Sequence, residues 1–269
     1  KQLYKPDQKI PFFNYVFRFL SKLIINITLI KMFPVFNNSF QQELNTFIKI
    51  KHKNNLYYFK DGHERLLWRY KTQYNEEKDL CSWIETFSKN DIFYDIGANV
   101  GMFSVYSAKM NIKTYVFEPH PANLNVLLYN IHLNNISEMI TVFPIALNAN
   151  NEITNMCYRD LTAGVAKNSI ASRNIDKKNK LNFNLISLNL NELSKLSNFE
   201  FPTKVKIDVD GLEYQILEGG SDVLFKANEM MVELYEDSEI KHKNYDDILK
   251  IMKKNNFIYS KKFKNNAYF

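Results

Sequence analysis

Four acidic residues of this chain come at or near the ends of short apolar runs, and they are the residues best suited to chemistry. They are Asp95, Glu118, Asp208 and Glu233. If the runs are parallel strands of one sheet, their carboxyl ends share an edge, which is where ligands bind in open α/β sheets. Four carboxylates at one edge would repel one another, and a cationic ligand or a metal ion would relieve that repulsion. The pattern therefore predicts an active site at this edge.

The turn after Asp95 indicates what this site would hold. Gly97 and Gly101 lie between an apolar run and a helical pattern over 101–110, in the order strand, tight turn and helix. Gly97 can take a positive φ and lets a ligand approach the backbone. Free N–H groups at the start of the helix would favour a polar or anionic ligand group. Glu118 ends the next predicted strand, where a carboxylate can accept hydrogen bonds from a ribose diol. A nucleoside-containing cofactor is therefore expected.

The glycine spacing separates two classes of cofactor. Dinucleotide-binding turns usually have the pattern G-x-G-x-x-G and hold a pyrophosphate at the helix N-terminus, whereas this turn has the sequence G-A-N-V-G. Asp95 directly precedes the turn and would repel a pyrophosphate but attract a cationic amine. S-adenosylmethionine carries an ammonium, a sulfonium and a ribose, so it suits Asp95 and Glu118 better than NAD does. The structural alternative is that the glycines only pack the helix on the strand.

The elements that must position these residues alternate between strands and helices, which predicts an α/β fold with a doubly wound, mostly parallel sheet. Strands are expected at 91–96, 113–118, 139–145, 204–209, 230–234 and near 257–263, and helices at 76–88, 101–110, from Pro121 onward and at 244–255. The helix after Pro121 should bury Leu124, Leu127, Leu128 and Ile131. Residues 150–186 do not fit a βαβ unit, and we expect two or three strands there, in an insertion that faces the substrate.

The chain has 269 residues, of which 45% are hydrophobic, and this is enough for one α/β domain with an N-terminal extension. We place the extension at 1–75, with a hairpin at 46–60, and the cofactor-binding domain at 76–269. Two cysteines are too few for a disulfide framework or a cysteine zinc site, so we expect a reducing, cytoplasmic compartment. The net charge of +6 comes from the first 80 residues, and no basic-aromatic array indicates nucleic acid.

Residues 11–36 are the most apolar region of the chain. Their longest uncharged run, Leu23 to Ile30, is far shorter than the ~20 residues of a membrane span. No small-residue cleavage site follows Ile30, so a signal peptide is not expected. The segment is interpreted as a helix packed on the domain or on a second subunit of a homo-oligomer. The alternative is a basic interfacial helix that makes peripheral contact with the inner face of a membrane.

Several stretches match a known family. They are FYDIGANVGMFSVYSAK, YVFEPHPANLNVLLYNIHLNN, VFPIALN, and KVKIDVDGLEYQILEGG with MVELYE downstream. Over residues 76–260 the chain resembles the FkbM family of S-adenosylmethionine-dependent methyltransferases, while residues 1–60 lie outside the resemblance. It implies a Rossmann-like class I methyltransferase fold. Asn189 departs from the leucine-aspartate pair that members often carry, and we assign it no role.

The resemblance also implies roles for residues of the site. The amino-acid end of the cofactor would be held by Gly97, Ala98, Asn99 and Gly101, and its ribose by Glu118. Pro119, beside Glu118, and Ala146, where the adenine would lie against the third strand, complete the expected cofactor site.

The expected reaction is methyl transfer to a hydroxyl of a sugar, glycan or natural product, with Asp208 as the first choice of base and Asp210 and Glu233 as second choices. A variant of this hypothesis has Mg²⁺ held by these three side chains, although we assign no metal ligand. The rival functions are an NAD-linked oxidoreductase and a non-catalytic module with the same fold. The expected partner is a small-molecule or glycan acceptor, and nucleic acid is not expected.

Overall fold

The computed structural model describes residues 47–269, except for 159–160, 165–168, 171–180, 197–198 and 235–244. The predicted segment 11–36 lies outside the described residues. A compact unit runs from Phe47 to Phe269, so the part of the predicted N-terminal extension from Phe47 onward, which includes the hairpin, shares one unit with the sheet. No helix within the described ranges is long and apolar enough to cross a membrane.

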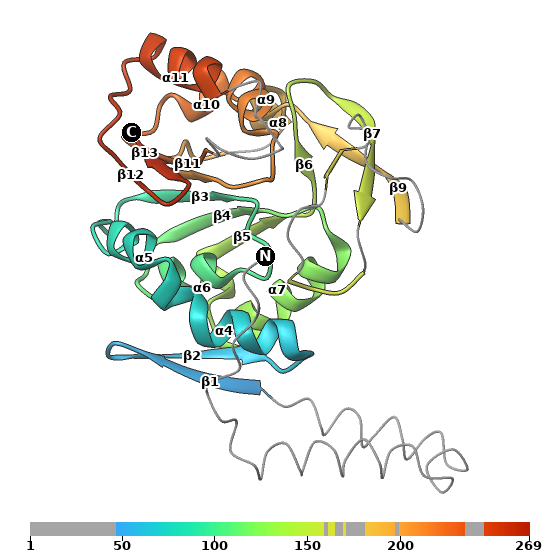
Figure 1. Cartoon of the computed structure of the whole chain (residues 1–269), viewed down its shortest axis with the longest axis vertical. Helices are drawn as coiled ribbons and strands as arrows, with labels where there is room; N and C mark the ends of the chain where they lie inside the picture. Colours follow the sequence, from blue (N-terminus) through green and yellow to red (C-terminus); the bar gives the residue numbers. More distant parts are fainter. Residues whose placement is uncertain (1–46, 159–160, 165–168, 171–180, 197–198, 235–244) are drawn as a thin grey trace, which may run out of the picture. The chain divides into compact units, whose positions relative to one another are not determined.

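A seven-stranded sheet forms the centre of this unit, with strand order β12-β13-β11-β10-β3-β4-β5 (Figure 1). The strands are β3 (Ile92–Ile96), β4 (Lys113–Phe117), β5 (Ile140–Phe143), β10 (Lys204–Ile207), β11 (Glu229–Glu233), β12 (Lys261–Phe263) and β13 (Asn266–Tyr268). The five strands from β5 to β11 are parallel, and β13 is antiparallel to both of its neighbours. The predicted doubly wound, mostly parallel sheet is therefore confirmed. Its order reverses between β3 and β10, which is the switch point where such sheets bind ligands.

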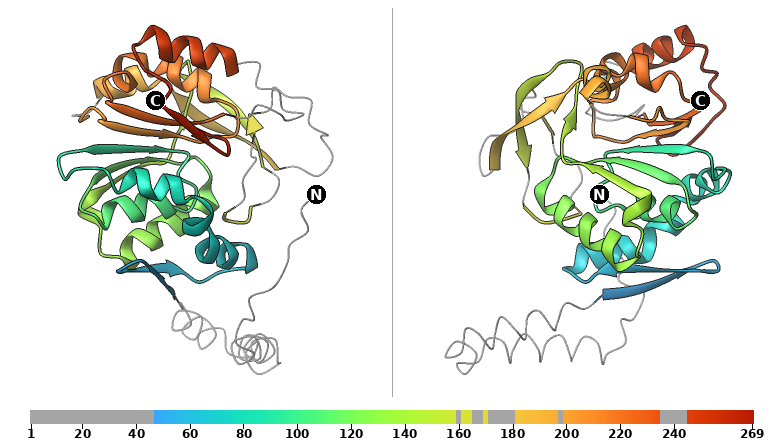
Figure 2. Two further views of the ribbon diagram at one scale, coloured as in Figure 1. Left: turned by 60° about the vertical axis from the view of Figure 1, so that its left-hand side comes forward. Right: turned by 180° about the vertical axis from the view of Figure 1, so that it is seen from behind.

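Helices cover both faces of the sheet (Figures 1 and 2). One layer contains α4 (Glu64–Glu76), α5 (Lys78–Ile84), α6 (Met102–Ala108) and α7 (Pro121–Leu133), and the other contains α8 (Leu190–Leu196), α9 (Glu213–Gly219), α10 (Ser221–Leu224) and α11 (Tyr245–Lys254). A short 3₁₀ helix, η1 (Ser137–Met139), precedes β5. Because both faces are covered, the central strands β3, β4 and β10 are almost wholly buried.

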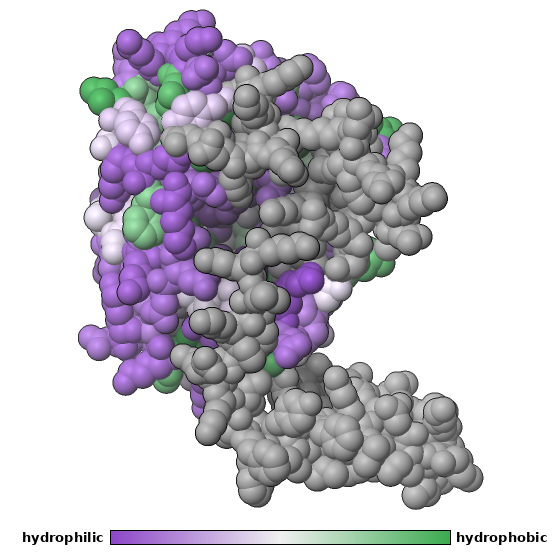
Figure 3. Space-filling view, in the orientation of Figure 1, coloured by the Kyte–Doolittle hydropathy of each residue, from purple (hydrophilic) through white to green (hydrophobic). Residues whose placement is uncertain are grey.

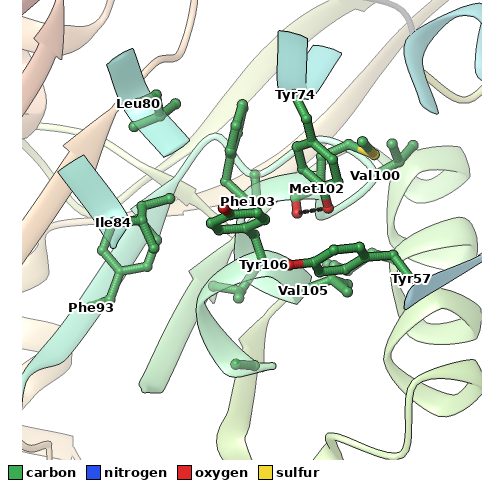
Figure 4. Packing of buried hydrophobic residues seen from close by; sticks show 14 of the residues in the cluster. Tyr57, Tyr74, Leu80, Ile84, Phe93, Val100, Met102, Phe103, Val105 and Tyr106 are labelled. Atoms are coloured by element: carbon green, nitrogen blue, oxygen red, sulfur yellow. Dashed lines mark hydrogen bonds between the residues drawn. The ribbon is translucent and has the colours of Figure 1, made fainter. Parts of the chain in front are cut away.

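An aromatic core lies between the sheet and the first helical layer (Figure 4). The rings of Tyr57 and Tyr106 stack with centroids 5.5 Å apart. The hydroxyl of Tyr74 donates a hydrogen bond of 2.9 Å to the carbonyl of Met102. All seven side chains of α6 are buried, because this helix lies between β3, β4 and α5. The first turn of α6 is therefore held firmly behind the predicted cofactor-binding loop.

The predicted hairpin consists of β1 (Phe47–His52) and β2 (Asn55–Lys60), which pair in antiparallel register around Lys53 and Asn54. Tyr57 and Phe59 point inward and are fully buried. The opposite side chains of the hairpin face outward. The hairpin thus packs on the unit through one face of a two-stranded ribbon.

The buried face of α7 differs in part from the predicted one. Leu128, which we expected in the core, is 54% exposed. Asn130 and Asn134 are buried instead and bind the edge of β2. The Asn134 side chain accepts from the Tyr58 N–H at 3.0 Å and donates to the Tyr58 carbonyl at 2.6 Å, and Asn130 accepts from the Lys60 N–H at 2.8 Å. Side-chain amides thus satisfy backbone groups that a strand at an edge leaves open.

The insertion forms a separate sheet of four strands in the order β6-β9-β7-β8. Its strands are β6 (Ala146–Leu147), β7 (Glu152–Tyr158), β8 (Ser169–Ile170) and β9 (Leu181–Leu188). The expectation of two or three strands over 150–186 is confirmed for the described part of that segment.

Candidate active site

The turn after β3 meets the loop after β10 at the switch point. Gly97 and Gly101 have φ values of 80° and 78°, which side-chain-bearing residues rarely adopt. A Cβ atom on Gly97 would lie 1.9 Å from the carbonyl oxygen of Asp208, and one on Gly101 would lie 2.1 Å from Cδ1 of Leu127. We expected Gly97 to leave room for a ligand, but the loop after β10 takes the place of its side chain. Both glycines are therefore required by close packing within the chain.

The backbone N–H groups of residues 97–101 all donate within the chain, whereas the expectation of free N–H groups concerns the first turn of α6 from Met102 and stays a prediction. Gly97 and Ala98 donate to the Phe117 carbonyl at 2.9 and 3.3 Å, Asn99 to Glu118 Oε2 at 2.7 Å, Val100 to Asn99 Oδ1 at 2.9 Å and Gly101 to the Ala98 carbonyl at 2.9 Å. An anionic pyrophosphate needs free donors at such a turn. Residues 97–101 themselves therefore offer such a group no unused N–H donor.

Glu118 joins the turn after β3 to the start of α7. Its carboxylate is almost fully buried and accepts from the N–H of Asn99 at 2.7 Å, the N–H of His120 at 2.8 Å and the side chain of Asn123 at 3.3 Å. Burial raises the pKa of Glu118 to about 7, against the opposing effect of these hydrogen bonds. A carboxylate has about four acceptor positions, so capacity remains for one more donor. Its role in binding a ribose stays a prediction, as does that of half-buried Pro119.

Lys206 neutralises the acidic edge, and sequence reasoning missed it. Its ammonium lies 3.1 Å from Asp95 Oδ1 and 3.3 Å from Asp208 Oδ2, and it is only 2% exposed. Burial would lower the pKa of Lys206, but its attraction to Asp95 and Asp208 raises that pKa overall. The repulsion among carboxylates is thus relieved by the protein itself. A lysine inside the apolar run from Lys204 to Ile207 was the available signal.

Asp95 is fully buried beneath the turn rather than open to solvent. Besides the contact with Lys206, its Oδ2 accepts from the hydroxyl of Ser104 at 2.6 Å. Because its charge is already paired, Asp95 attracts a cationic cofactor less strongly than the sequence suggested. Its role as a cofactor-binding residue remains untested.

Asp208 is the acidic side chain best placed to meet a substrate, because it ends β10 at the switch point and is 41% exposed. Burial would raise its pKa, but the charge of Lys206, a hydrogen bond with the Glu233 side chain and the charge of Arg69 lower it overall. Asp208 is therefore ionised at neutral pH. The next residues, Asp210 and Gly211, have φ values of 59° and 115° and form a tight turn.

Glu213, at the start of α9, holds this turn in place. Its carboxylate accepts from the N–H of Gly211 at 3.0 Å and from that of Val209 at 3.4 Å. Burial raises the pKa of Glu213 to about 7.

Arg69 of α4 connects the insertion to the acidic edge, and it too was missed from the sequence. Its guanidinium donates to the Gly164 carbonyl at 3.0 Å and to Gln73 Oε1 at 3.2 Å. Burial lowers the pKa of Arg69, while the charges of Asp208 and Asp210 act in the opposite direction. Gly164 also donates its N–H to Asn123 at 2.8 Å. The network Arg69–Gly164–Asn123–Glu118 therefore runs from the insertion to the predicted ribose site.

No metal centre accompanies these residues. Within the described part of the chain, no group of three or more His, Cys, Asp or Glu side chains is arranged to hold a metal ion. The hypothesis that Asp208, Asp210 and Glu233 hold a Mg²⁺ ion thus gains no support. Ala146 is buried at the start of β6, two intervening residues after the end of β5, and its place beside the adenine stays a prediction.

A cavity of about 910 Å³ lies away from this site. It is lined by Trp83, Asn228, Glu229 and Tyr268, among others. Glu229 is the first residue of β11, so the cavity opens at the amino ends of the strands. The acidic side chains and the glycine turn described above lie at the opposite, carboxyl edge of the sheet.

Comparisons with known proteins bear on the family of this chain. Residues 95–259 match the methyltransferase FkbM domain. The chain is 24% identical over 172 residues to the hexuronic acid methyltransferase AglP of Haloferax volcanii, covering 63% of this chain and 66% of that protein. It is 24% identical over 190 residues to the methyltransferase sdnD of Sordaria araneosa, covering 61% and 73%. The match thus spans slightly less than two thirds of the first relative.

Solved structures with a similar arrangement are distant. An FkbM methyltransferase of Methylobacillus flagellatus has 16% identity and a TM-score of 0.42, covering 62% of this chain and 38% of that chain. A putative rRNA methylase of Clostridium thermocellum has 11% identity and a TM-score of 0.47, covering 71% and 92%. The family match covers more than half of the sequence, from the end of β3 past α11. The chain therefore belongs to the FkbM methyltransferase family.

Proposed function

We propose that this chain transfers a methyl group from S-adenosylmethionine to a hydroxyl group of a sugar, glycan or natural product. The observation that carries the proposal is the meeting of Gly97 and Asp208 at the switch point of the sheet. A cofactor-binding turn and a half-exposed, ionised carboxylate lie side by side there. Family membership supports methyl transfer, and the name of the hexuronic acid methyltransferase relative supports a sugar acceptor.

The residues present fit this cofactor better than NAD. The turn has the sequence G-A-N-V-G rather than the dinucleotide pattern, and the N–H groups of residues 97–101 are used within the chain, so a cofactor without a pyrophosphate suits it. Gly97, Ala98, Asn99 and Gly101 would line its amino-acid end. Glu118 would accept from its ribose with its remaining acceptor capacity, and Pro119 and Ala146 would lie toward its base. When bound, the cofactor supplies an electrophilic methyl group.

Asp208 would orient the acceptor hydroxyl and take its proton as the new bond forms. A carboxylate with a lowered pKa is a weak base, so it suits a reaction in which the proton leaves late. Most of the rate enhancement would then come from alignment of the two reactants. Lys206 fixes the Asp208 carboxylate from beneath at 3.3 Å. Lys206 is thus a positioning residue, and Asp208 the proposed catalytic residue.

Two measurements test the proposal. Calorimetry should show heat of binding with S-adenosylmethionine and none with NAD, and a labelled methyl group should pass to a saccharide acceptor. Asp208→Asn should keep the cofactor Kd and lower kcat about 100-fold. Asp222→Asn, an exposed residue on α10, is the matched control. Absence of heat with S-adenosylmethionine would contradict the cofactor assignment, and full turnover by Asp208→Asn would remove the proposed role of that residue.

A further inference from the structure

On the outward face of the β1–β2 hairpin, lysines lie across from apolar side chains of the neighbouring strand. Three cross-strand pairs face outward, Phe47 with Lys60, Lys49 with Tyr58 and Lys51 with Leu56. Each pair combines one lysine with one apolar residue. Along β1 the inward residues are partly buried and the outward ones exposed. We call these six residues the hairpin face.

The hairpin face is strongly basic. Residues 47–60 contain four lysines and no acidic residue. Lys53 at the turn is bound to Glu85 at 2.6 Å, which leaves three lysines on the hairpin face itself. Lys49 lies over the rings of Phe47 and Tyr58 at 5.8 Å, and Lys60 lies 3.8 Å from the ring of Tyr129 on α7. In these lysine pairings, aromatic rings take the place of carboxylates.

Protection of a sheet edge explains only part of this pattern. Lysines on edge strands prevent pairing with other chains. That role does not require large apolar side chains between the lysines. Phe47 and Leu56 are each 46% exposed, although small or polar residues would serve an edge equally well. The mixture of cations with exposed apolar groups indicates a binding partner whose surface carries negative charge and has an apolar layer beneath it.

We propose that the hairpin face binds an anionic lipid surface. Lysine ammonium groups attract anionic headgroups, and each contributes on the order of 1 kcal/mol near such a surface. Phe47, Leu56 and Tyr58 would enter the boundary between headgroups and acyl chains, as the apolar faces of interfacial elements do. The lysine stems can lie along the same apolar layer while their charges remain in the headgroup region.

A single-stranded nucleic acid fits the hairpin face less well. Such ligands stack their bases on flat aromatic platforms. The rings of Phe47 and Tyr58 meet edge to face, with centroids 5.5 Å apart and an angle of 69°, so they do not form a shared platform. Leu56 offers no ring. On the side of the molecule in Figure 3, the described surface is mostly hydrophilic.

The test is sedimentation of the full chain with vesicles. Phosphatidylcholine vesicles containing about a third phosphatidylglycerol should bind the protein more tightly than pure phosphatidylcholine, and added salt should weaken that binding. Lys49→Gln with Lys51→Gln should weaken it about 30-fold, which corresponds to about 1 kcal/mol per lysine. Phe47→Ser with Leu56→Ser should weaken it in a way that low salt does not restore.

The matched control is Lys253→Gln with Lys254→Gln. These lysines are exposed on α11, in the opposite helical layer, and the change in net charge is the same. This variant should bind as the unaltered chain does, and circular dichroism should show that every variant is folded. No binding to anionic vesicles, or binding that the two hairpin variants leave unchanged, would overturn the proposal. So would tighter binding of a single-stranded oligonucleotide that is lost in the hairpin variants. Because none of these residues touches the candidate site, the result is independent of methyl transfer.

Discussion

At the scale of single residues, the candidate site depends on buried charges that satisfy one another. The acidic residues at the strand ends could be predicted, because each follows an apolar run. Lys206 could not be assigned, because a lysine in a four-residue strand can point to either helical layer. Only the structure places its ammonium between Asp95 and Asp208. The buried charges at the base of the site are therefore paired, and the side chain of Asp208 is 41% exposed.

Replacing Lys206 should destabilise the fold, because it removes the cation that pairs with these carboxylates. Lys206→Met leaves the buried carboxylate of Asp95 without its cation, which should lower the free energy of unfolding by about 3 kcal/mol or more. The double variant Asp95→Asn with Lys206→Met should recover part of the loss, because it removes both charges. Urea unfolding at pH 7 measures both values. Lys250→Met, at an exposed position on α11, should change stability little. Equal losses in the single and double variants would contradict the pairing.

Glu118 should make stability depend on pH. Burial raises its pKa from 4.5 to about 7, so the folded state binds a proton more tightly than the unfolded state. The stabilisation is complete below pH 4.5 and is lost as the pH rises through 7. At about 1.4 kcal/mol per pH unit, the contribution across this window is about 3 kcal/mol.

The measurement is urea unfolding of the unaltered chain and of Glu118→Gln at several pH values between 5 and 8. The difference in stability between the two should change across this range in favour of the variant as the pH rises. Glu218→Gln, an exposed change on α9, serves as the control. A difference that is independent of pH would show that the pKa of Glu118 is not raised in the folded state.

At the scale of secondary-structure elements, the segments with a regular apolar pattern could be predicted from the sequence. The buried face of α7 could not. The hairpin, the central parallel strands and α6 follow from apolar runs, turn residues and glycines. The burial of α7 followed a different rule, because its neighbour is the edge of β2 as well as a hydrophobic layer. Asparagines complete that edge, and Leu128 is turned to solvent. Hydrophobic periodicity does not detect a polar buried face whose partners are backbone groups.

Removing one of these asparagines should loosen the hairpin. Asn134→Leu leaves both the N–H and the carbonyl of Tyr58 without their partners, and each unsatisfied group costs about 1–3 kcal/mol. We expect a loss of about 3 kcal/mol in unfolding free energy. Hydrogen exchange at the amides of Tyr58 and Lys60 should become faster. The reverse change, Leu128→Asn on the exposed face, should stay within about 0.5 kcal/mol. Unchanged exchange at Tyr58 would show that α7 does not hold β2.

At the scale of the whole molecule, three parts that are distant in sequence meet around the carboxyl edge. Helix α4 contributes Arg69, the insertion contributes Gly164, and the sheet contributes Asp208. The resemblance to a family identified the sheet and its turns, because their motifs are local. It could not identify Arg69, which we had placed in an extension outside the cofactor-binding domain. A contact between a helix before the first central strand and an insertion after the third is set by the tertiary fold.

Arg69 should therefore affect catalysis while leaving cofactor binding intact. Arg69→Met removes a positive charge that lowers the pKa of Asp208 and a donor to the Gly164 carbonyl at 3.0 Å. The pKa of Asp208 should rise, so the acidic limb of the pH profile of kcat/KM should move to higher pH. At neutral pH kcat/KM should fall about tenfold, because the insertion loses its anchor beside the acceptor, while the Kd for S-adenosylmethionine should change less than twofold. Lys71→Met, an exposed change on the same helix, should leave the profile in place. A variant with reduced activity but an unshifted acidic limb would mean that Arg69 acts through the insertion alone, with no electrostatic influence on Asp208.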